Sequence, residues 1–125
     1  MAAILAPAYA SAQTSNLHIF AKQGDFDNAA NCINRHDDVN AFDDDGYTPL
    51  MYAADIGQND IVKILMDNGA DPNCLPLYNN EPPALHAAVI NNHPVTLDLL
   101  LMYERTKPNL LDSAGYTALY MAARN

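Results

Sequence analysis

The sequence contains little positive charge and no tryptophan. Six Lys and Arg stand against fifteen Asp and Glu among 125 residues, so the formal net charge is −9 at pH 7. A nucleic-acid binder needs a basic face to neutralise phosphates, and docking on anionic lipid needs one as well. No apolar run reaches the ~18 residues that span a bilayer. We therefore expect neither nucleic acid as a partner nor insertion into a membrane.

Cysteine is scarce, and no catalytic pattern stands out. Cys32 and Cys74 are too few for a disulfide scaffold and lack zinc-site spacing. The run 43–45 resembles part of a calcium loop, but Ala41 and Tyr52 occupy positions where that loop needs ligands. His-x-x-x-His pairs, glycine-rich phosphate loops and nucleophile elbows are missing from the sequence. We predict that the chain is not an enzyme and uses no cofactor or metal.

The first thirteen residues differ from the rest in composition. Residues 1–13 carry no charge, and Ala10-Ser11-Ala12 is a small-x-small site of the kind that a signal peptidase cuts. The segment resembles the latter part of a secretory signal peptide without its positively charged start. The alternative is an alanine-rich tail outside the fold. If the segment is cleaved, the mature protein begins near Gln13 and is periplasmic or secreted; otherwise we expect a cytoplasmic protein.

An internal repeat organises residues 14–125. Four leucines follow one another at spacings of 33, 35 and 34 residues, namely Leu17, Leu50, Leu85 and Leu119. An asparagine closes each of the first three units (Asn40, Asn73 and Asn109), and the tripeptide Gly-Tyr-Thr occurs at 46–48 and at 115–117. This register predicts a repeat array with units at about 14–42, 43–75, 76–110 and, incomplete, 111–125.

The second unit carries signals for a turn and a helix. Gly46 stands where a tight turn needs a positive φ, which glycine adopts most easily. Thr48 suits the N-cap and Pro49 the first position of a helix. We predict that this helix runs to about Asp55 and ends before Gly57, a residue suited to a left-handed cap.

A second helix is predicted directly after the first. We expect Asn59 to cap it, Gly69 to end it, and a buried stripe to consist of Ile61, Val62, Ile64 and Leu65. Cys32 lies one repeat before Leu65, so we expect it to be buried as a small hydrophobe, with both thiols of the chain free. Each unit would then be a finger followed by two short antiparallel helices, stable only against its neighbours.

These features together resemble the ankyrin repeat. Residues 43–73, DDDGYTPLMYAADIGQNDIVKILMDNGADPN, carry its Gly-x-Thr-Pro-Leu start and its Gly-Ala-Asp-x-Asn end, and the likeness covers residues 17–125. The resemblance implies an all-α repeat solenoid, an ankyrin-like stack of helix-turn-helix units joined by β-hairpin fingers. It also implies that His86 ties neighbouring units together by hydrogen bonds. The third unit departs from the pattern at 81–84 and at 102–107.

The resemblance also indicates where a partner would bind, on the concave face built from finger tips and first helices. Carried over position by position, it assigns partner contacts to Asp44, Asp45, Tyr47, Asp55, Ile56, Tyr78, Asn79, Asn80, Ile90, Asn91, Ser113 and Tyr116. We expect the tyrosines to be the anchors, since aromatic residues dominate interface hot spots. The alternative is that they pack along the fingers and stabilise them. The acidic run 43–45 would suit a basic partner, or it is a solvated turn.

Two functions are compatible with these residues. The first is a non-catalytic interaction module that binds an unknown protein or peptide on its concave face. The alternative is a scaffold or targeting segment of a larger multidomain protein whose activity lies outside this chain. Both functions are inferred from the resemblance and from the missing catalytic residues, because no motif in the sequence indicates a particular ligand.

Overall fold

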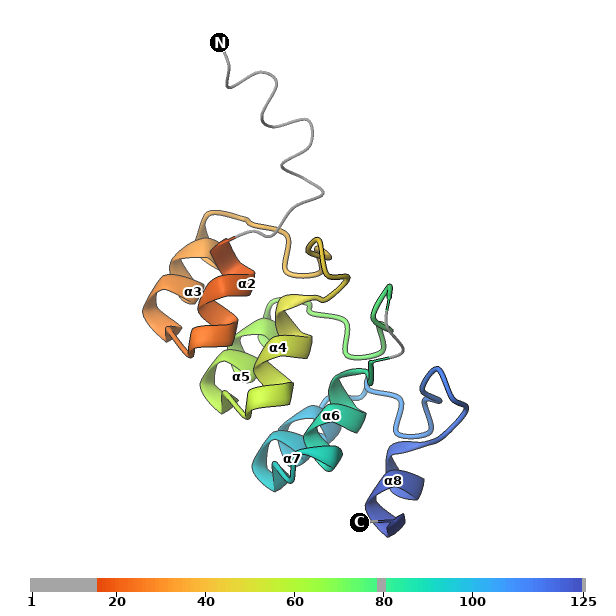
Figure 1. Ribbon diagram of the computed structural model, residues 1–125. Coiled ribbons are helices and arrows are strands. Elements are labelled where there is room, and N and C mark those ends of the chain that lie inside the picture. Colours follow the sequence, from red (N-terminus) through yellow and green to blue (C-terminus); the bar gives the residue numbers. More distant parts are fainter. Residues whose placement is uncertain (1–15, 79–80, 125) are drawn as a thin grey trace.

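The computed structural model describes residues 16–78 and 81–124, which contain seven α-helices and no β-strand. The helices are α2 (Asn16–Gln23), α3 (Phe26–Asn34), α4 (Pro49–Ile56), α5 (Asn59–Asp67), α6 (Ala84–Ile90), α7 (Pro94–Leu101) and α8 (Ala118–Arg124). They form two rows, with α2, α4, α6 and α8 in one row and α3, α5 and α7 in the other (Figure 1). The predicted all-α repeat solenoid is confirmed, whereas the segment 1–13 lies outside the described residues.

Helix α4 begins where the sequence predicts. The Thr48 hydroxyl accepts a hydrogen bond from the Met51 backbone N–H (3.3 Å), and the Thr48 N–H donates to Met51 Sδ (3.4 Å). Pro49 occupies the first helical position, where its missing N–H costs nothing. The helix ends at Ile56, one residue later than predicted, and Gly57 caps it with φ +84°.

Helix α5 corrects two details of the prediction. Asn59 is not the N-cap but the first helical residue; Gln58 precedes it and makes no side-chain cap bond. The Asn59 side-chain oxygen accepts a hydrogen bond from Thr96 Oγ1 of α7 instead. Ile64 is only half-buried, whereas Met66 is 1% exposed. The reason is that α3 and α7 both pack against α5, so that more than a single stripe of its surface is buried.

In the ranges 16–78 and 81–124, two residues other than glycine take the left-handed conformation at helix ends. Asn92 (φ 58°) stands at the place of Gly57 in the preceding unit, and His36 (φ 66°) at the place of Gly69. The next residue in each case donates its backbone N–H to a carbonyl of the helix that has just ended. Asp37 donates to Cys32 (3.1 Å), and His93 donates to Ala88 (2.8 Å). His36 therefore serves to turn the chain after α3.

The fingers are turns held by aspartate side chains. In the finger before α4, Asp43 Oδ1 accepts hydrogen bonds from the N–H groups of Asp45 and Tyr47, each at 3.0 Å. Asp112 repeats this arrangement before α8 with the N–H groups of Ala114 and Tyr116. Because regular strands do not form in the described ranges, the β-hairpin part of the prediction is not confirmed. Short side chain to backbone bonds replace a strand ladder there.

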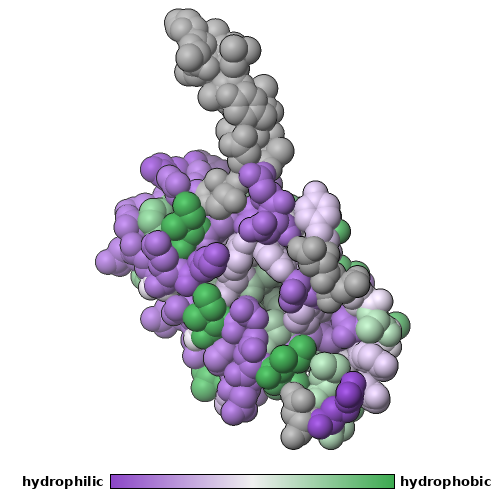
Figure 2. Space-filling model, in the orientation of Figure 1, coloured by the Kyte–Doolittle hydropathy of each residue, from purple (hydrophilic) through white to green (hydrophobic). Residues whose placement is uncertain are grey.

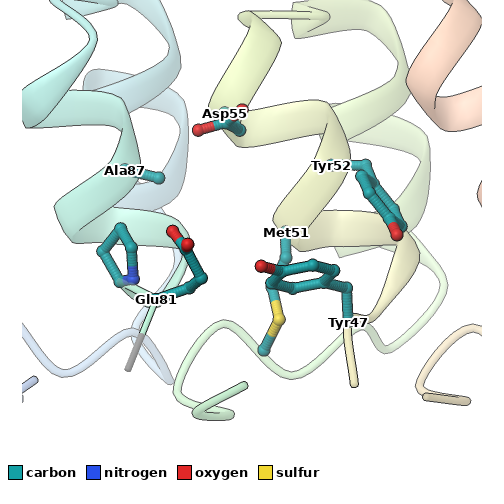
Figure 3. A pocket seen from close by; sticks show the side chains of 7 residues that line it. Tyr47, Met51, Tyr52, Asp55, Glu81 and Ala87 are labelled. Carbon is teal, nitrogen blue, oxygen red and sulfur yellow. The ribbon is translucent and has the colours of Figure 1, made fainter. Parts of the chain in front are cut away.

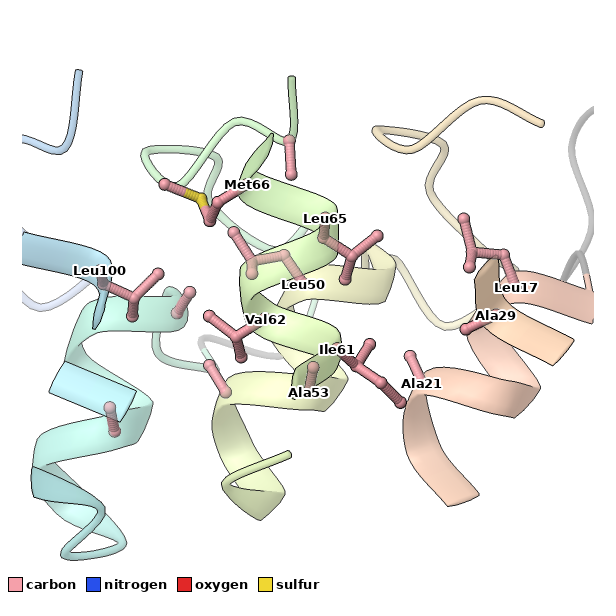
Figure 4. Close-up of a cluster of buried hydrophobic side chains, with 14 of the residues drawn as sticks. Leu17, Ala21, Ala29, Leu50, Ala53, Ile61, Val62, Leu65, Met66 and Leu100 are labelled. Carbon is pink, nitrogen blue, oxygen red and sulfur yellow. The ribbon is translucent and has the colours of Figure 1, made fainter. Parts of the chain in front are cut away.

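The core runs along the seam between the two rows. The repeat leucines Leu17, Leu50 and Leu85 are at most 2% exposed, and Figure 4 shows Leu17 next to Ala29 and Leu50 next to Leu65. Cys32 is fully buried there, as predicted. Leu119, the fourth repeat leucine, is 78% exposed. In the described residues no second helix follows α8, so nothing covers this side chain as α5 covers Leu50.

Polar side chains connect each unit to the next. The amide of Asn40 donates to the Gly69 carbonyl (3.1 Å) and accepts from the Asp71 N–H (2.7 Å). Asn73 makes the same pair of bonds with Arg105 and Lys107 one unit later. The asparagine that closes a unit thus clamps the corresponding turn of its neighbour.

Arg105 compensates for the lost Gly-Ala-Asp turn of the third unit. Its guanidinium donates hydrogen bonds to two carbonyls at the C-terminal end of α5. One belongs to Met66 in the last turn of the helix, and the other to Ala70, just after the helix. A cation at that end also interacts favourably with the helix dipole. The residues 102–107 that depart from the repeat pattern therefore contribute a contact of their own.

His86 is buried and bridges two units, as the resemblance implies. Its Nε2–H donates to the Tyr116 carbonyl in the next finger (2.7 Å). At the same repeat position in the first unit, the His18 Nε2–H donates to the Ala41 carbonyl (2.7 Å), which comes earlier in the chain than the finger. The other ring nitrogen of His86, Nδ1, has no hydrogen-bond partner in the described part of the chain. The cap position before α6 is Pro83, which has no N–H to donate.

Candidate partner-binding face

The row of first helices and the fingers together border a pocket between α4 and α6. Its volume is about 130 Å³, and it is lined by Tyr47, Met51, Tyr52, Asp55, Glu81, Pro82 and Ala87. Figure 3 shows Asp55 on α4 and Glu81 before α6 on the two sides of the pocket, with the Tyr47 ring across its front. The pocket therefore lies between the first helices of the second and third units and is bordered by a finger residue, Tyr47.

Two of the lining residues are tyrosines, and a lysine of α2 lies next to one of them. The rings of Tyr47 and Tyr52 meet edge to face, with centroids 5.2 Å apart. The Tyr52 hydroxyl donates to Asp43 Oδ2 (2.5 Å), which fixes the ring against the finger. Lys22 Nζ lies 5.2 Å from the centroid of the Tyr52 ring, within the range of a cation–π contact. The aromatic surface is thus positioned by bonds from both the finger and α2.

Carboxylates give this part of the face a negative potential. Burial raises the pKa of the Tyr47 hydroxyl, and the nearby charges of Glu81, Asp45 and Asp55 raise it further. Burial also raises the pKa of Tyr52, together with its hydrogen bond to Asp43. Both hydroxyls therefore stay neutral at physiological pH and can donate hydrogen bonds.

Asp55 and Asn91, two of the predicted contact residues, are bonded to each other. Asn91 Nδ2 donates to Asp55 Oδ1 (2.7 Å), and His93 Nε2 donates to the Asp55 carbonyl (3.0 Å). The end of α4 is thereby tied to the turn after α6. This bridge leaves the second carboxylate oxygen of Asp55 for other interactions.

Most of the predicted contact residues are accessible. Asp44, Asp45, Asp55, Asn91 and Ser113 are exposed, and Tyr47 is half-buried. Ile56 and Ile90 are 41% and 39% exposed at the ends of α4 and α6. Asn79 and Asn80 lie outside the described residues. Figure 2 shows this side of the molecule as largely hydrophilic, with hydrophobic residues among the polar ones.

The three tyrosines expected as anchors all pack against their own array. Tyr47 contacts Tyr52, and Tyr116 stacks on Tyr120 with centroids 4.5 Å apart. Tyr78 lies so close to the neighbouring finger that a Cβ on Gly46 would be 2.8 Å from its Cδ2. Tyr78 and Tyr116 nevertheless keep 54% and 38% of their surface exposed. The packing alternative and the anchor prediction are therefore compatible.

Sequence reasoning missed several residues of the pocket. Met51, Tyr52, Glu81, Pro82 and Ala87 line it but were not assigned to partner contacts. Glu81 and Pro82 fall where the third unit departs from the repeat pattern, so position-by-position transfer had no rule for them. The charge of Glu81 beside two prolines was the signal that could have pointed to an exposed, rigid segment.

The described residues contain no group of three or more His, Cys, Asp or Glu side chains placed to hold a metal ion. Both cysteines are free thiols. Burial, and to a lesser extent the charge of Asp71, raises the pKa of Cys74 to about 11, so this thiol is protonated at neutral pH. Across ranges 16–78 and 81–124, every helix falls short of the length and apolar character needed to cross a bilayer.

The helix pairs stack side by side, leave one face polar and enclose a small pocket between two units. These features are typical of repeat solenoids, the class of proteins that bind ligands on the extended surface of such a stack. The family profile described as ankyrin repeats (3 copies) matches residues 4–76, more than half of the chain, and a second ankyrin profile (many copies) matches residues 57–102. The chain belongs to the ankyrin repeat family.

Curated proteins from several animals contain similar stretches. The human BCL-6 corepressor-like protein 1 is 39% identical over 87 residues, which is 70% of this chain and 5% of that protein. Human ankyrin repeat family A protein 2 is 41% identical over 64 residues, 51% of this chain and 20% of that protein. Protein lin-12 of Caenorhabditis elegans is 39% identical over 100 residues, 78% of this chain and 7% of that protein. The chain spans a small part of the length of these relatives.

Proposed function

We propose that the chain binds a protein or peptide on its concave face and does not catalyse a reaction. Ankyrin repeats are in general protein–protein interaction modules, and this chain belongs to that family. The observation that carries the proposal is the pocket between α4 and α6, where a half-buried tyrosine, two carboxylates and small apolar side chains converge. Pockets with a few polar groups on an apolar lining are the usual form of a recognition site.

Exposed apolar side chains extend this surface along the helix row. Ile56 and Ile90 end two successive first helices, and each leaves about two fifths of its surface to solvent. Removal of such side chains from water on binding is favourable, at about 25 cal/mol per Å² of apolar area. A partner that contacts both isoleucines and the pocket would bridge the second and third units.

The test is affinity capture with the full chain as bait and two double variants. Tyr47→Ala combined with Ile56→Ala removes an aromatic and an aliphatic side chain from the concave face. Phe26→Ala combined with Val95→Ala removes a similar pair from the second helix row, where both residues are exposed. Circular dichroism would verify that both variants keep their helix content.

We expect proteins from an extract of the source organism to be retained by the unchanged chain and by the Phe26/Val95 variant, and lost by the Tyr47/Ile56 variant. Mass spectrometry would quantify them. Equal retention by both variants, or selective loss with the Phe26/Val95 variant, would show that the concave face is the wrong surface.

A second proposal is that the repeats are part of a larger protein, as they are in the relatives described above. The stretches that match this chain make up only 5% to 20% of the relatives described above. This supports the alternative that these repeats are a scaffold or targeting segment of a larger protein. Detection in cell extracts of a protein well above 13.6 kDa, by an antibody raised against this chain, would support that alternative.

Export to the periplasm or the medium is a separate proposal that rests on the composition of residues 1–13. N-terminal sequencing of the protein purified from its source would test it. A chain that begins near Gln13 and is found outside the cytoplasm would support cleavage of a signal. An intact Met1 on cytoplasmic protein would argue against it.

A further inference from the structure

The groove between α2 and α4 offers a comparison within the same molecule. It is lined by His18, Ile19, Lys22, Asp43, Asp45 and Tyr52. There the Lys22 ammonium lies over the Tyr52 ring, and carboxylates line the same groove. In the groove between α2 and α4, a basic side chain of the protein itself, Lys22, therefore lies beside an aromatic ring and carboxylates.

The next groove, between α4 and α6, has the same kind of walls but lacks the lysine. Asp55 stands at the repeat position of Lys22, five residues after the repeat leucine. Ala87 stands at the position of Tyr52, so a methyl group replaces a ring and leaves space open. None of the residues that line this pocket in the described part of the chain is basic.

We propose that this pocket binds one lysine or arginine side chain of the partner. The proposal rests on the proposed function and names the chemistry that the concave face recognises. Asp55 and Glu81 would lie on the two sides of the incoming charge, and the face of the Tyr47 ring would contact it. Met51, Pro82 and Ala87 provide apolar surface for the methylene groups of the side chain.

The electrostatics and the size of the pocket agree with such a ligand. Burial is the main cause of the raised pKa of Tyr47, and the charges of four neighbouring carboxylates add to it; the field of these carboxylates favours a cation at this place. The volume of about 130 Å³ is close to that of cavities of ~150 Å³ that hold a benzene-sized group. The pocket thus accommodates the end of one side chain and not a folded element.

The test uses short synthetic peptide libraries with a single fixed central residue. Four libraries carry lysine, arginine, acetyl-lysine or norleucine at that position, and all other positions are random. Binding to the full chain is measured by fluorescence anisotropy, and contacts are located from backbone amide shifts in NMR spectra. We expect the lysine and arginine libraries to bind more tightly than the two neutral ones and to shift amides within 47–55 and 81–87.

Matched variants connect the preference to the pocket. We expect Glu81→Gln to lower the affinity for the lysine library about five-fold and Glu104→Gln, an exposed glutamate after α7, to leave it unchanged. Tyr47→Leu should lower it about three-fold, whereas Tyr47→Phe, which keeps the ring, should not. The preference should also weaken as the salt concentration rises.

Two negative results have different meanings. If the amides of 47–55 and 81–87 shift equally with lysine and norleucine libraries, or do not shift with any library, the cationic specificity is refuted. The proposed function is judged separately, by whether the Tyr47/Ile56 variant loses captured proteins. If Glu104→Gln weakens lysine binding as much as Glu81→Gln does, only the net charge of the chain matters, and the pocket assignment is refuted.

Discussion

Replacement of Gly46 by alanine should destabilise the protein more than the same change at Gly69. Both glycines belong to the second unit and have nearly the same backbone conformation, with φ +83° and +91°. An added Cβ at Gly69 meets nothing within 4 Å. An added Cβ at Gly46 would lie 2.8 Å from Tyr78 Cδ2 and 2.9 Å from Leu77 Cβ. The pair thus separates backbone strain from contact between fingers.

The magnitudes follow from these two terms. A left-handed conformation costs an L-residue about 1–2 kcal/mol, partly offset because alanine restricts the unfolded chain. Gly69→Ala should therefore cost about 1 kcal/mol. At Gly46, overpacking adds about 1–3 kcal/mol. The neighbouring finger cannot simply move away, because the Leu77 N–H donates to the Gly46 carbonyl (3.0 Å). We expect a total of about 3 kcal/mol for Gly46→Ala.

Urea denaturation followed by far-ultraviolet circular dichroism measures both free energies of unfolding. The slope of unfolding free energy against urea concentration should be unchanged, which would show that the same cooperative unit unfolds in each variant. Gly115→Ala is a further control, since Gly115 has φ +86° at the finger position of the fourth unit and open space around it. Equal losses for Gly46→Ala and Gly69→Ala would refute close packing between the fingers.

Three further substitutions test one contact between units and two contacts within a unit. Arg105→Lys keeps the charge but loses the planar donor set at the end of α5, so we expect the free energy of unfolding in urea to fall by about 1 kcal/mol. An unchanged value would refute a stabilising role of these hydrogen bonds. Because the pKa of Tyr52 is raised by burial and by Asp43, its contribution is full below about pH 10 and falls at higher pH. In Tyr52→Phe, the alkaline loss of stability should therefore be smaller. Pro83→Thr adds an N-cap and an N–H for His86 Nδ1 and should raise stability by about 1 kcal/mol, seen as a higher melting temperature; a lower one would refute the role of the missing donor.

The exposure of some residues on the predicted binding face could be predicted from their position in the repeat, whereas the contacts of others could not. The accessibility of Ile56 and Ile90 was predictable, because both stand just before the turn that ends a first helix. The bond between Asp55 and Asn91 was not, since these residues are 36 positions apart and meet only through the offset between stacked units. Asp43 was predicted as part of a solvated or partner-binding acidic run. It is 5% exposed, because its carboxylate holds the finger and the Tyr52 hydroxyl.

Local preferences of the residues were enough to predict the start of α4 and the glycine that caps its end. A cap, a proline and a left-handed glycine act over a few neighbouring positions. Burial repeats at Leu17, Leu50 and Leu85 but not at Leu119, which no second helix covers in the described residues. Which side chains share a pocket was decided by the stacking of one unit on another. Tyr47 and Glu81 are far apart in the chain and belong to different units, yet they line one pocket together with Ala87, whose methyl group stands where the second unit has the Tyr52 ring.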